Sequence, residues 1–215
     1  MYKKKPFFIV FEGIEGCGKS YQGKKLYNRF KKKGISTVLT REPGGTKSSE
    51  LIRNLILKDY FTKDSKEKFD KYTDTLLYLA ARNEHIKNKI KPALLKKKVV
   101  ICDRFIDSTL AYQVYGKKVE LNFIKNIHKK ILQGIKPNIV FVLKVSNQSS
   151  RKRLKKRKNK NRYDNFVQSF YNKAQNSFIR IAKNKKNYFI LDSSSNDSSL
   201  EHKIFGICKK YLNIK

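Results

Sequence analysis

The sequence predicts an α/β fold in which a five-stranded parallel sheet carries helices on both of its faces. Five short runs are almost continuously apolar and rich in β-branched residues, as expected for strands that are buried on both sides. Segments with helical apolar periodicity separate these runs. A chain of 215 residues with 39% hydrophobic residues can bury one sizeable core, so we expect a single domain over residues 1–215.

The expected strands alternate with helices along the chain, and the sequence contains no internal repeat. The strands cover residues 7–11, 36–39, 99–102, 138–145 and 188–191. The helices cover residues 19–33, 72–90, 120–133 and about 199–212. Gly34 is a natural end for the first helix, and the polar stretch 193–199 is typical of a loop before the last one. In such an open sheet, ligands bind beyond the carboxyl ends of the strands.

A glycine-rich motif directly follows the first expected strand and fits G-x-x-x-x-G-K-[ST]. Its residues are Gly13, Ile14, Glu15, Gly16, Cys17, Gly18, Lys19 and Ser20. Glycines let successive backbone N–H groups face phosphate oxygens, and the dipole of the following helix favours anions. We expect Lys19 to reach the β- and γ-phosphates of a nucleotide and Ser20 to help hold Mg²⁺. The motif predicts a P-loop NTPase fold, which GTPases, ATPases and small-molecule kinases share.

A second loop, TREPGGT at residues 40–46, follows the second expected strand. There, a buried Arg41 beside the turn at Pro43 would present a fixed guanidinium to a phosphate. An ordinary turn with a stray charge is an equally good interpretation of this loop on its own.

A third feature lies on the helix predicted for residues 72–90. Tyr78 and Arg82 are four residues apart, so they share one face of that helix. The tyrosine ring can stack on a base while the arginine binds the edge of the base or its phosphate. Without the other motifs, a core tyrosine and a surface arginine would be the better interpretation.

The fourth feature is a dense polar segment directly after the third expected strand. Asp103 is placed to act on Mg²⁺ through water, and Arg104 can bridge the phosphates of a donor and an acceptor. Ser108, Tyr112 and Gln113 fall on about one face of the next helix and are candidates to read a nucleoside. An unrelated helix start is the alternative.

A basic segment follows the fourth expected strand, at about residues 151–163. Arg153, Arg157 and Arg162 would form a lid that closes over ATP and neutralises charge on the transferring phosphoryl group. From the composition of this segment alone, a solvated basic helix or a nucleic-acid patch is the better interpretation.

The chain has 51 Lys and Arg residues against 17 Asp and Glu, which gives a formal net charge of +34. A polyanion partner and compositional drift towards lysine both explain this excess, and the spread of the lysines along the chain favours drift. Either way, the charge attracts anionic ligands. The three cysteines fit no metal site; Cys102 and Cys208 lie in apolar runs, as core residues do, and the pattern suggests a reducing compartment.

The sequence contains neither a signal peptide nor a transmembrane run. The first apolar run is too short for a signal peptide, and no run approaches the roughly 18 apolar residues of a spanning helix. We therefore expect a cytoplasmic protein without a membrane partner.

Together these segments resemble thymidylate kinase, from about residue 6 to residue 212. The P-loop is widely shared, whereas the TREPGGT loop and the DR…S…AYQ segment together are close to diagnostic. The resemblance implies a five-stranded parallel sheet, a homodimer, and transfer of the γ-phosphoryl group of ATP to dTMP with Mg²⁺. Ser20 and Asp103 would hold the metal, partly through water.

The resemblance also assigns roles within the acceptor pocket. It implies that Glu15 binds the sugar 3′-hydroxyl, that Tyr78 stacks on thymine and that Arg82 contacts the base. Tyr112 would crowd a ribose 2′-hydroxyl, which favours deoxyribose. The residues expected to bind dTMP are Glu15, Arg41, Pro43, Tyr78, Arg82, Arg104, Ser108, Tyr112 and Gln113. ATP would bind residues 13–20 and Arg153, and the expected catalytic residues are Lys19, Asp103, Arg104, Arg153 and Arg157.

A few positions depart from the family pattern. The family often has Tyr or His at Phe105, glycine at Val114 and Tyr115, and Asp at Asn161. None of these changes removes a phosphate-handling group. An arginine-bearing lid and a P-loop without arginine resemble the bacterial subgroup, in which the lid supplies the catalytic cation.

Three other functions remain open from the sequence. The first is a kinase for another monophosphate or for deoxynucleosides, since Tyr78 and Arg82 favour a pyrimidine only loosely. The second is a P-loop switch or partitioning ATPase, which would need no second anion pocket. The third is a nucleic-acid-binding protein, but no aromatic-basic RNA motif is present, so nucleic acid is not a required partner.

Overall fold

The computed structural model describes residues 5–58, 67–157, 167–195 and 198–214. Its five strands form one parallel sheet in the order β2-β3-β1-β4-β5, as the sequence predicted. The strands are β1 (Phe7–Glu12), β2 (Thr37–Arg41), β3 (Val99–Asp103), β4 (Ile139–Lys144) and β5 (Tyr188–Asp192). The three central strands are almost wholly buried and the edge strands only partly, which explains why the central runs are continuously apolar.

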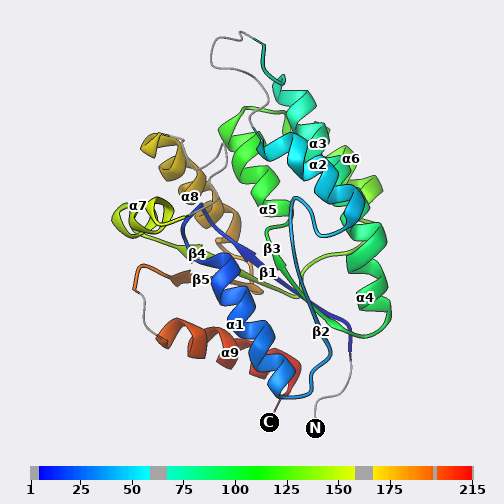
Figure 1. Cartoon of the computed structure of the whole chain (residues 1–215), viewed down its shortest axis with the longest axis vertical. Coiled ribbons are helices and arrows are strands. Elements are labelled where there is room, and N and C mark those ends of the chain that lie inside the picture. Colours follow the sequence, from blue (N-terminus) through cyan, green and yellow to red (C-terminus); the bar gives the residue numbers. More distant parts are fainter. Residues whose placement is uncertain (1–4, 59–66, 158–166, 196–197, 215) are drawn as a thin grey trace.

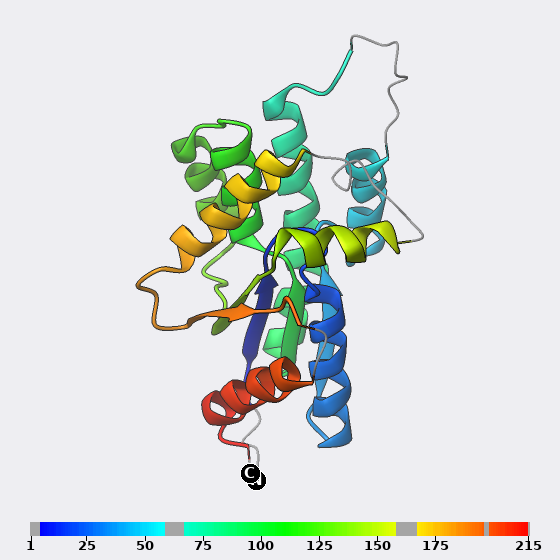
Figure 2. The ribbon, with the colours of Figure 1, turned by 90° about the vertical axis from the view of Figure 1, so that its left-hand side faces the viewer.

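Helices cover both faces of this sheet, which confirms the predicted fold class (Figures 1 and 2). Helix α1 (Lys19–Lys32) packs on β1, β2 and β3 and against α9 (Ser199–Leu212). Helix α8 (Gln168–Ala182) packs on β4 and β5 and lies on the opposite side of the sheet from α1 (Figure 2). None of the helices that the structure describes is long and apolar enough to cross a membrane.

The helix predicted at residues 72–90 is part of a longer continuous run. It consists of α3 (Lys71–His85), a π-helical turn η1 (Ile86–Ile90) and α4 (Lys91–Leu95). The Asp70 side chain accepts a hydrogen bond from the Tyr72 backbone N–H at 2.7 Å, so it caps the first turn. Tyr78 and Arg82 lie in the regular part of this run.

A second helical run directly follows β3. The short helix α5 (Ile106–Thr109) continues into a π-helical segment η2 (Leu110–Gly116). In π-helical geometry the hydrogen bonds join residues five apart, so each turn is wider than an α-helical turn. Ser108 of α5 and Gln113 of η2 both line the same cavity.

Helix α6 (Leu121–Ile131) confirms the helix predicted at 120–133, but three helices were not predicted. They are α2 (Lys47–Leu57), α7 (Asn147–Lys155) and α8. Thr46 caps α2 in a reciprocal capping box with Ser49, and Ser146 caps α7 by accepting from the Ser149 N–H. Helix α8 buries an apolar stripe at helical spacing, which the sequence already contained.

Aromatic side chains fill the core between the sheet and its helices. Phe11 of β1 stacks on Phe141 of β4, with ring centroids 5.2 Å apart. Phe105 packs edge-on against Phe8 at 5.0 Å, so this departure from the family pattern lies in the core. Cys102 and Cys208 are buried free thiols, as predicted.

Candidate active site

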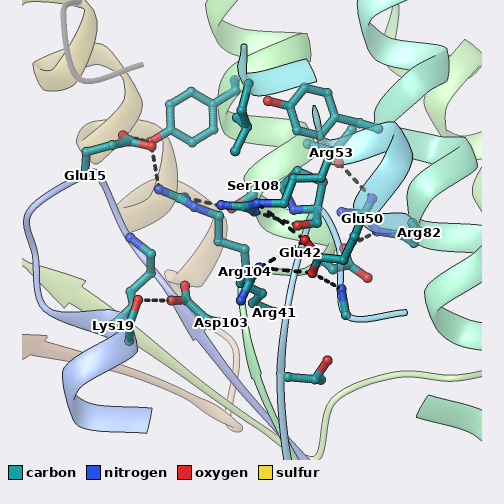
Figure 3. A pocket seen from close by; sticks show the side chains of 18 of the residues that line it. Glu15, Lys19, Arg41, Glu42, Glu50, Arg53, Arg82, Asp103, Arg104 and Ser108 are labelled. Atoms are coloured by element: carbon teal, nitrogen blue, oxygen red, sulfur yellow. Dashed lines mark hydrogen bonds and ion pairs between the residues drawn. The ribbon is translucent and has the colours of Figure 1, made fainter. Parts of the chain in front are cut away.

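The loops that follow β1, β2 and β3 open into one cavity of about 1190 Å³ (Figure 3). These three strands are neighbours in the sheet, so their carboxyl ends meet at one edge. The basic residues at the cavity include Lys19, Arg41, Arg53, Arg82, Arg104, Arg153 and Arg157, and its acidic residues include Glu15, Glu42, Glu50 and Asp103. The clustered guanidinium groups suit a ligand with more than one phosphate.

The P-loop joins β1 to α1 along a path that requires glycine. At Gly13, where φ is +139°, a Cβ atom would lie 2.5 Å from the Leu143 carbonyl oxygen. Gly18 has φ +91° and precedes the first residue of α1 without a side-chain cap. The first N–H groups of α1 therefore have no side-chain acceptor at the N-cap, which is the arrangement that binds phosphate in P-loops.

The side chain of Lys19 folds back over the P-loop. Its Nζ donates to the carbonyl oxygens of Gly13 at 3.1 Å and Ile14 at 2.8 Å, and it lies 3.6 Å from Cys17 Sγ. The ammonium is buried within the loop that would hold a nucleotide. Burial is the main cause that raises the pKa of Cys17, so this cysteine is a neutral thiol.

Ser20 and Asp103 meet across the cavity floor. The Ser20 hydroxyl donates to Asp103 Oδ2, which joins the start of α1 to the end of β3. Hydroxyl and carboxylate oxygens are ligands that Mg²⁺ prefers, and this pair matches the two protein ligands of P-loop NTPases. The predicted metal-ligand residues are therefore adjacent.

Arg104 occupies the centre of the cavity, as Figure 3 shows. Its Nη1 donates to the Gly13 carbonyl at 2.9 Å and to Ser108 Oγ at 3.0 Å, and its Nη2 donates to Glu15 Oε1 at 2.7 Å. Its backbone has φ +73°, a left-handed conformation that non-glycine residues seldom adopt. This turn aims the guanidinium at the P-loop.

Glu15 and Tyr112 complete the cluster around Arg104. The Tyr112 hydroxyl donates to Glu15 Oε2 at 2.6 Å, and the Arg104 guanidinium lies 5.2 Å from the centroid of the Tyr112 ring. Burial, followed by the charge of Glu15, raises the pKa of Tyr112 well above its ordinary value. Tyr112 is therefore a neutral hydrogen-bond donor inside the pocket.

Arg41 corrects one expectation, because its side chain is not buried. It is 53% exposed, and its Nη2 lies 3.0 Å from both carboxylate oxygens of Glu50 on α2. Glu50 also accepts from the Gly45 N–H at 2.8 Å. The guanidinium is thus held by an ion pair at the rim of the cavity, and α2, which was not predicted, supplies the partner.

Arg53 on α2 lines the cavity and was missed at the sequence level. Its Nη1 donates to the Pro43 carbonyl at 2.6 Å, which ties α2 to the TREPGGT loop. Burial and the nearby charge of Arg41 lower the pKa of Arg53, as expected for two cations that face one anion site. The capping sequence at Thr46 and Ser49 would have indicated this helix and so its arginine.

Arg82 is almost fully buried, with 3% of its side chain exposed. Its Nε donates to Glu42 Oε2 and its Nη1 to Thr109 Oγ1, both at 2.7 Å. Nη1 also contacts His128 Nε2 at 2.9 Å, and Nη2 donates to the Phe105 carbonyl at 2.7 Å. Within the described part of the chain, these contacts occupy four of the five guanidinium N–H groups and leave one on Nη2.

The contacts with Arg82 help to determine the protonation states of His128 and Glu42. Arginine only donates, so His128 must accept through an unprotonated Nε2. Burial and the charge of Arg82 lower the pKa of His128 to about 3, which agrees with a neutral ring. Burial would raise the pKa of Glu42, but Arg82 and His85 outweigh it, so the carboxylate is ionised.

Tyr78 and Gln113 line the same cavity, as their predicted roles require. Gln113 is buried, and its Nε2 is one of two buried side-chain atoms without a hydrogen-bond partner among the described residues. A buried amide that lacks a partner is costly unless a ligand or water supplies one. Its donor is therefore available to a bound molecule.

The predicted lid lies only partly within the described residues. Arg153 on α7 donates to the Gly16 carbonyl at 3.2 Å and to the Ser193 carbonyl at 2.7 Å. The Ser150 hydroxyl donates to the Glu15 carbonyl at 2.9 Å, so α7 packs directly on the P-loop. Arg157 lines the cavity, whereas Arg162 and Asn161 lie outside the described residues.

A family model described as Thymidylate kinase matches residues 11–204 of the chain. The chain belongs to the thymidylate kinase family. The thymidylate kinase of Wolbachia sp. subsp. Brugia malayi is 45% identical over 181 residues, which cover 83% of this chain and 82% of the relative. The thymidylate kinase of Sulfurihydrogenibium sp. is 37% identical over 198 residues, which cover 92% and 94%.

Solved structures agree with this family assignment. The crystal structure of thymidylate kinase from Ehrlichia chaffeensis matches with a TM-score of 0.73 at 30% identity, covering 95% of this chain and 99% of that one. Like that member of the thymidylate kinase family, the chain has the P-loop NTPase fold.

Proposed function

We propose that this protein is a nucleoside monophosphate kinase that transfers the γ-phosphoryl group of ATP to dTMP, giving dTDP and ADP for dTTP synthesis. One observation carries the proposal: a P-loop and a second arginine-rich anion pocket share one cavity, and Arg104 lies between them. An ATPase that transfers phosphate to water has no use for the second pocket. Membership of the thymidylate kinase family favours dTMP as the acceptor.

The P-loop would bind the donor. The N–H groups of residues 13–20 and the start of α1 suit the phosphates of ATP, and Lys19 would leave its loop carbonyls to contact the β- and γ-phosphates. Arg153 lies beside Gly16 and would contact the same nucleotide from the lid.

The base of the acceptor would meet Tyr78, Arg82 and Gln113. Among the described residues, Arg82 has one N–H left for a ligand, and Gln113 has an amide donor that lacks a protein partner. Two fixed donors suit a base that presents acceptors on its edge, and Tyr78 would stack on its face. Glu15 is placed to accept from the sugar 3′-hydroxyl, beside the Tyr112 ring.

Three arginines would bind the acceptor phosphate. Arg41 and Arg53 meet at the Glu50 carboxylate on the side of β2, and Arg104 faces them from the end of β3. The residues that we propose to bind dTMP are Glu15, Arg41, Pro43, Arg53, Tyr78, Arg82, Arg104, Ser108, Tyr112 and Gln113.

Mg²⁺ would bind at Ser20 and Asp103. Their oxygen atoms are already in contact, and both are hard ligands of the kind this metal takes. When bound, the metal would neutralise charge on the donor phosphates.

The chemistry then follows from positioning. The acceptor phosphate is already largely ionised at pH 7, so no general base is required. An acceptor phosphate oxygen forms a bond to the γ-phosphorus while the bond from that phosphorus to the β-phosphate oxygen breaks. Lys19, Arg104, Arg153 and Arg157 would hold the reacting groups in line and neutralise the developing charge.

We also infer that the protein works in the cytoplasm and that two copies of the chain associate. Helices α2 and α3 lie side by side (Figure 1). Three leucines on these helices are exposed. Leu51 is 70%, Leu55 44% and Leu76 47% exposed. Such a group of exposed apolar side chains is typical of a subunit interface.

A coupled ADP-release assay with ATP and Mg²⁺ tests the activity against each nucleoside monophosphate, with a control that lacks acceptor. We expect turnover with dTMP well above that with any other monophosphate. Equal ADP release without acceptor would instead identify an ATPase, and preference for another monophosphate would reassign the acceptor.

A further inference from the structure

Glu12 is the last residue of β1 and is completely buried directly before the P-loop. Its carboxylate accepts three hydrogen bonds from the segment after β3. Oε1 accepts from the backbone N–H groups of Phe105 at 2.8 Å and Ser108 at 3.2 Å. Oε2 accepts from the Ser108 hydroxyl at 2.6 Å.

These bonds fasten the turn that carries Arg104. The Phe11 carbonyl accepts from the Arg104 N–H at 2.9 Å, and Glu12 accepts from the next N–H along the chain. The end of β1 therefore holds a backbone whose φ of +73° is seldom adopted.

A hydrogen-bond relay also joins Glu12 to the Arg104 guanidinium. Arg104 Nη1 donates to Ser108 Oγ at 3.0 Å, and the Ser108 hydroxyl donates in turn to Glu12. An acceptor at Glu12 Oε2 takes the proton of that hydroxyl and leaves both lone pairs of Ser108 Oγ available to Arg104. Glu12 thus fixes both the backbone and the side chain of the arginine without lining the cavity itself.

The surroundings of Glu12 disfavour its charge. Burial and the nearby carboxylate of Asp107 raise the pKa of Glu12 to about 7, against the lowering effect of Ser108 and Arg104. Cys102 on β3 and Tyr188 on β5 also feel the charge of Glu12, and the same charge helps to raise their pKa values. An ionised Glu12 therefore destabilises the folded protein. A purely structural role would not require a charged group at this position.

We propose that Glu12 is a positioning residue for phosphoryl transfer, whose ionised carboxylate holds the Arg104 turn and the Ser108 hydroxyl so that Arg104 faces both phosphates. This inference rests on the proposed kinase function. A neutral Glu12 loses an acceptor, because a protonated oxygen must donate. The Ser108 hydroxyl then has to rotate, and the Arg104 guanidinium is held less firmly, by Gly13 and Glu15.

The substitution Glu12→Gln tests this inference, because an amide keeps one acceptor oxygen and replaces the other with a donor. Turnover with ATP and dTMP is measured for wild type and E12Q from pH 6 to pH 8.5. Using the ratio of the two kcat values removes the titration of the substrates. E84Q on α3 is the matched control, since Glu84 does not line the cavity and binds Ser48 and Asn88.

We expect E12Q to lower kcat at pH 8 by about 10- to 100-fold, the usual effect of a misplaced reacting group, with little change in the KM for ATP. The wild-type to E12Q ratio should fall towards one as the pH drops below about 7. When the same kcat ratio is measured in an Asp107→Asn background, it should fall towards one at a lower pH. The Asp107 carboxylate helps to raise the pKa of Glu12, and this substitution removes its charge.

Other outcomes are distinguishable. A wild type that does not phosphorylate dTMP would refute the proposed function. An active wild type with a kcat ratio near one, or with a ratio that is the same at every pH, would overturn the role of Glu12. Thermal unfolding of E12Q is followed in parallel, and a drop in kcat that only mirrors a loss of folded protein would also overturn it.

Discussion

At the scale of single residues, most polar groups of the cavity already have protein partners before any ligand binds. Arg82 is the clearest case, with four contacts from Glu42, Thr109, His128 and the Phe105 carbonyl. A side chain held this firmly loses little conformational entropy when a base arrives. Gln113 is the complementary case, because its amide donor lacks a partner in the part of the chain that the structure describes.

Gln113→Leu should therefore weaken acceptor binding without weakening the fold. Removal of one hydrogen bond to the nucleoside, worth about 1 kcal/mol, should raise the KM for dTMP by roughly five- to tenfold. Because none of the described residues is a partner for the Nε2 group, the free energy of unfolding should stay the same or rise. Steady-state kinetics and urea unfolding measure the two effects. An unchanged KM for dTMP would show that Gln113 does not bind the acceptor.

His128 should make the fold sensitive to acid. Its pKa of about 3 in the folded protein lies below its ordinary value of 6.5. Between these two pH values, the imidazole is protonated in the unfolded chain and neutral in the folded protein. Stability is complete above pH 6.5 and is lost as the pH falls towards 3. His128→Gln, which keeps an acceptor for Arg82, should remove about 2 kcal/mol of that loss at pH 5. Urea unfolding at pH 5 and pH 7 compares the two proteins; equal pH dependence would contradict this account.

At the scale of helices and strands, the site depends on how each helix begins and winds. The open start of α1 follows the P-loop, and α5 and η2 carry Ser108 and Gln113, which both line the cavity. Helix α2 begins at the capping box of Thr46 and Ser49, and it carries both Glu50 and Arg53. The cap therefore connects local helix stability to the position of two cavity residues.

Thr46→Ala should show this connection. Loss of the capping hydroxyl should lower the free energy of unfolding by about 1 kcal/mol. Because α2 also orients Arg53 and the Glu50 partner of Arg41, the KM for dTMP should rise while the KM for ATP stays constant. Urea unfolding and kinetics with each substrate varied test this. A rise in the KM for ATP alone would show that the substitution affects the ATP site and not the dTMP site.

The sequence predicted the strands well because central parallel strands are apolar on both faces, and that signal is strong in Phe7–Glu12 and Ile139–Lys144. The motif residues were also found, since a P-loop and the segment after Asp103 have fixed spacing. The sequence did not predict that Arg41 is exposed. Its side chain lies at the rim of the cavity because it pairs with Glu50, nine residues further along the chain. Arg53 was missed because its role depends on how α2 folds back, which no local pattern records.

At the scale of the whole molecule, the exposed leucines of α2 and α3 predict association. Leu51→Glu should produce a monomer, because a charge would be buried at the contact between two copies. Sedimentation velocity distinguishes the two states. Leu95→Glu on α4, an equally exposed leucine on another helix, is the control and should leave the assembly unchanged. A wild type that is already monomeric would contradict the inferred dimer.

The position of Lys19 has a consequence for the energetics of the whole reaction. Its ammonium already has two carbonyl partners within the loop, so nucleotide binding exchanges these partners and does not simply add new ones. The loop thus behaves as a tethered competitor for the lysine, which lowers the net gain from the ground-state nucleotide. The lysine therefore raises the turnover rate only to the extent that it binds the transition state more strongly than the bound nucleotide.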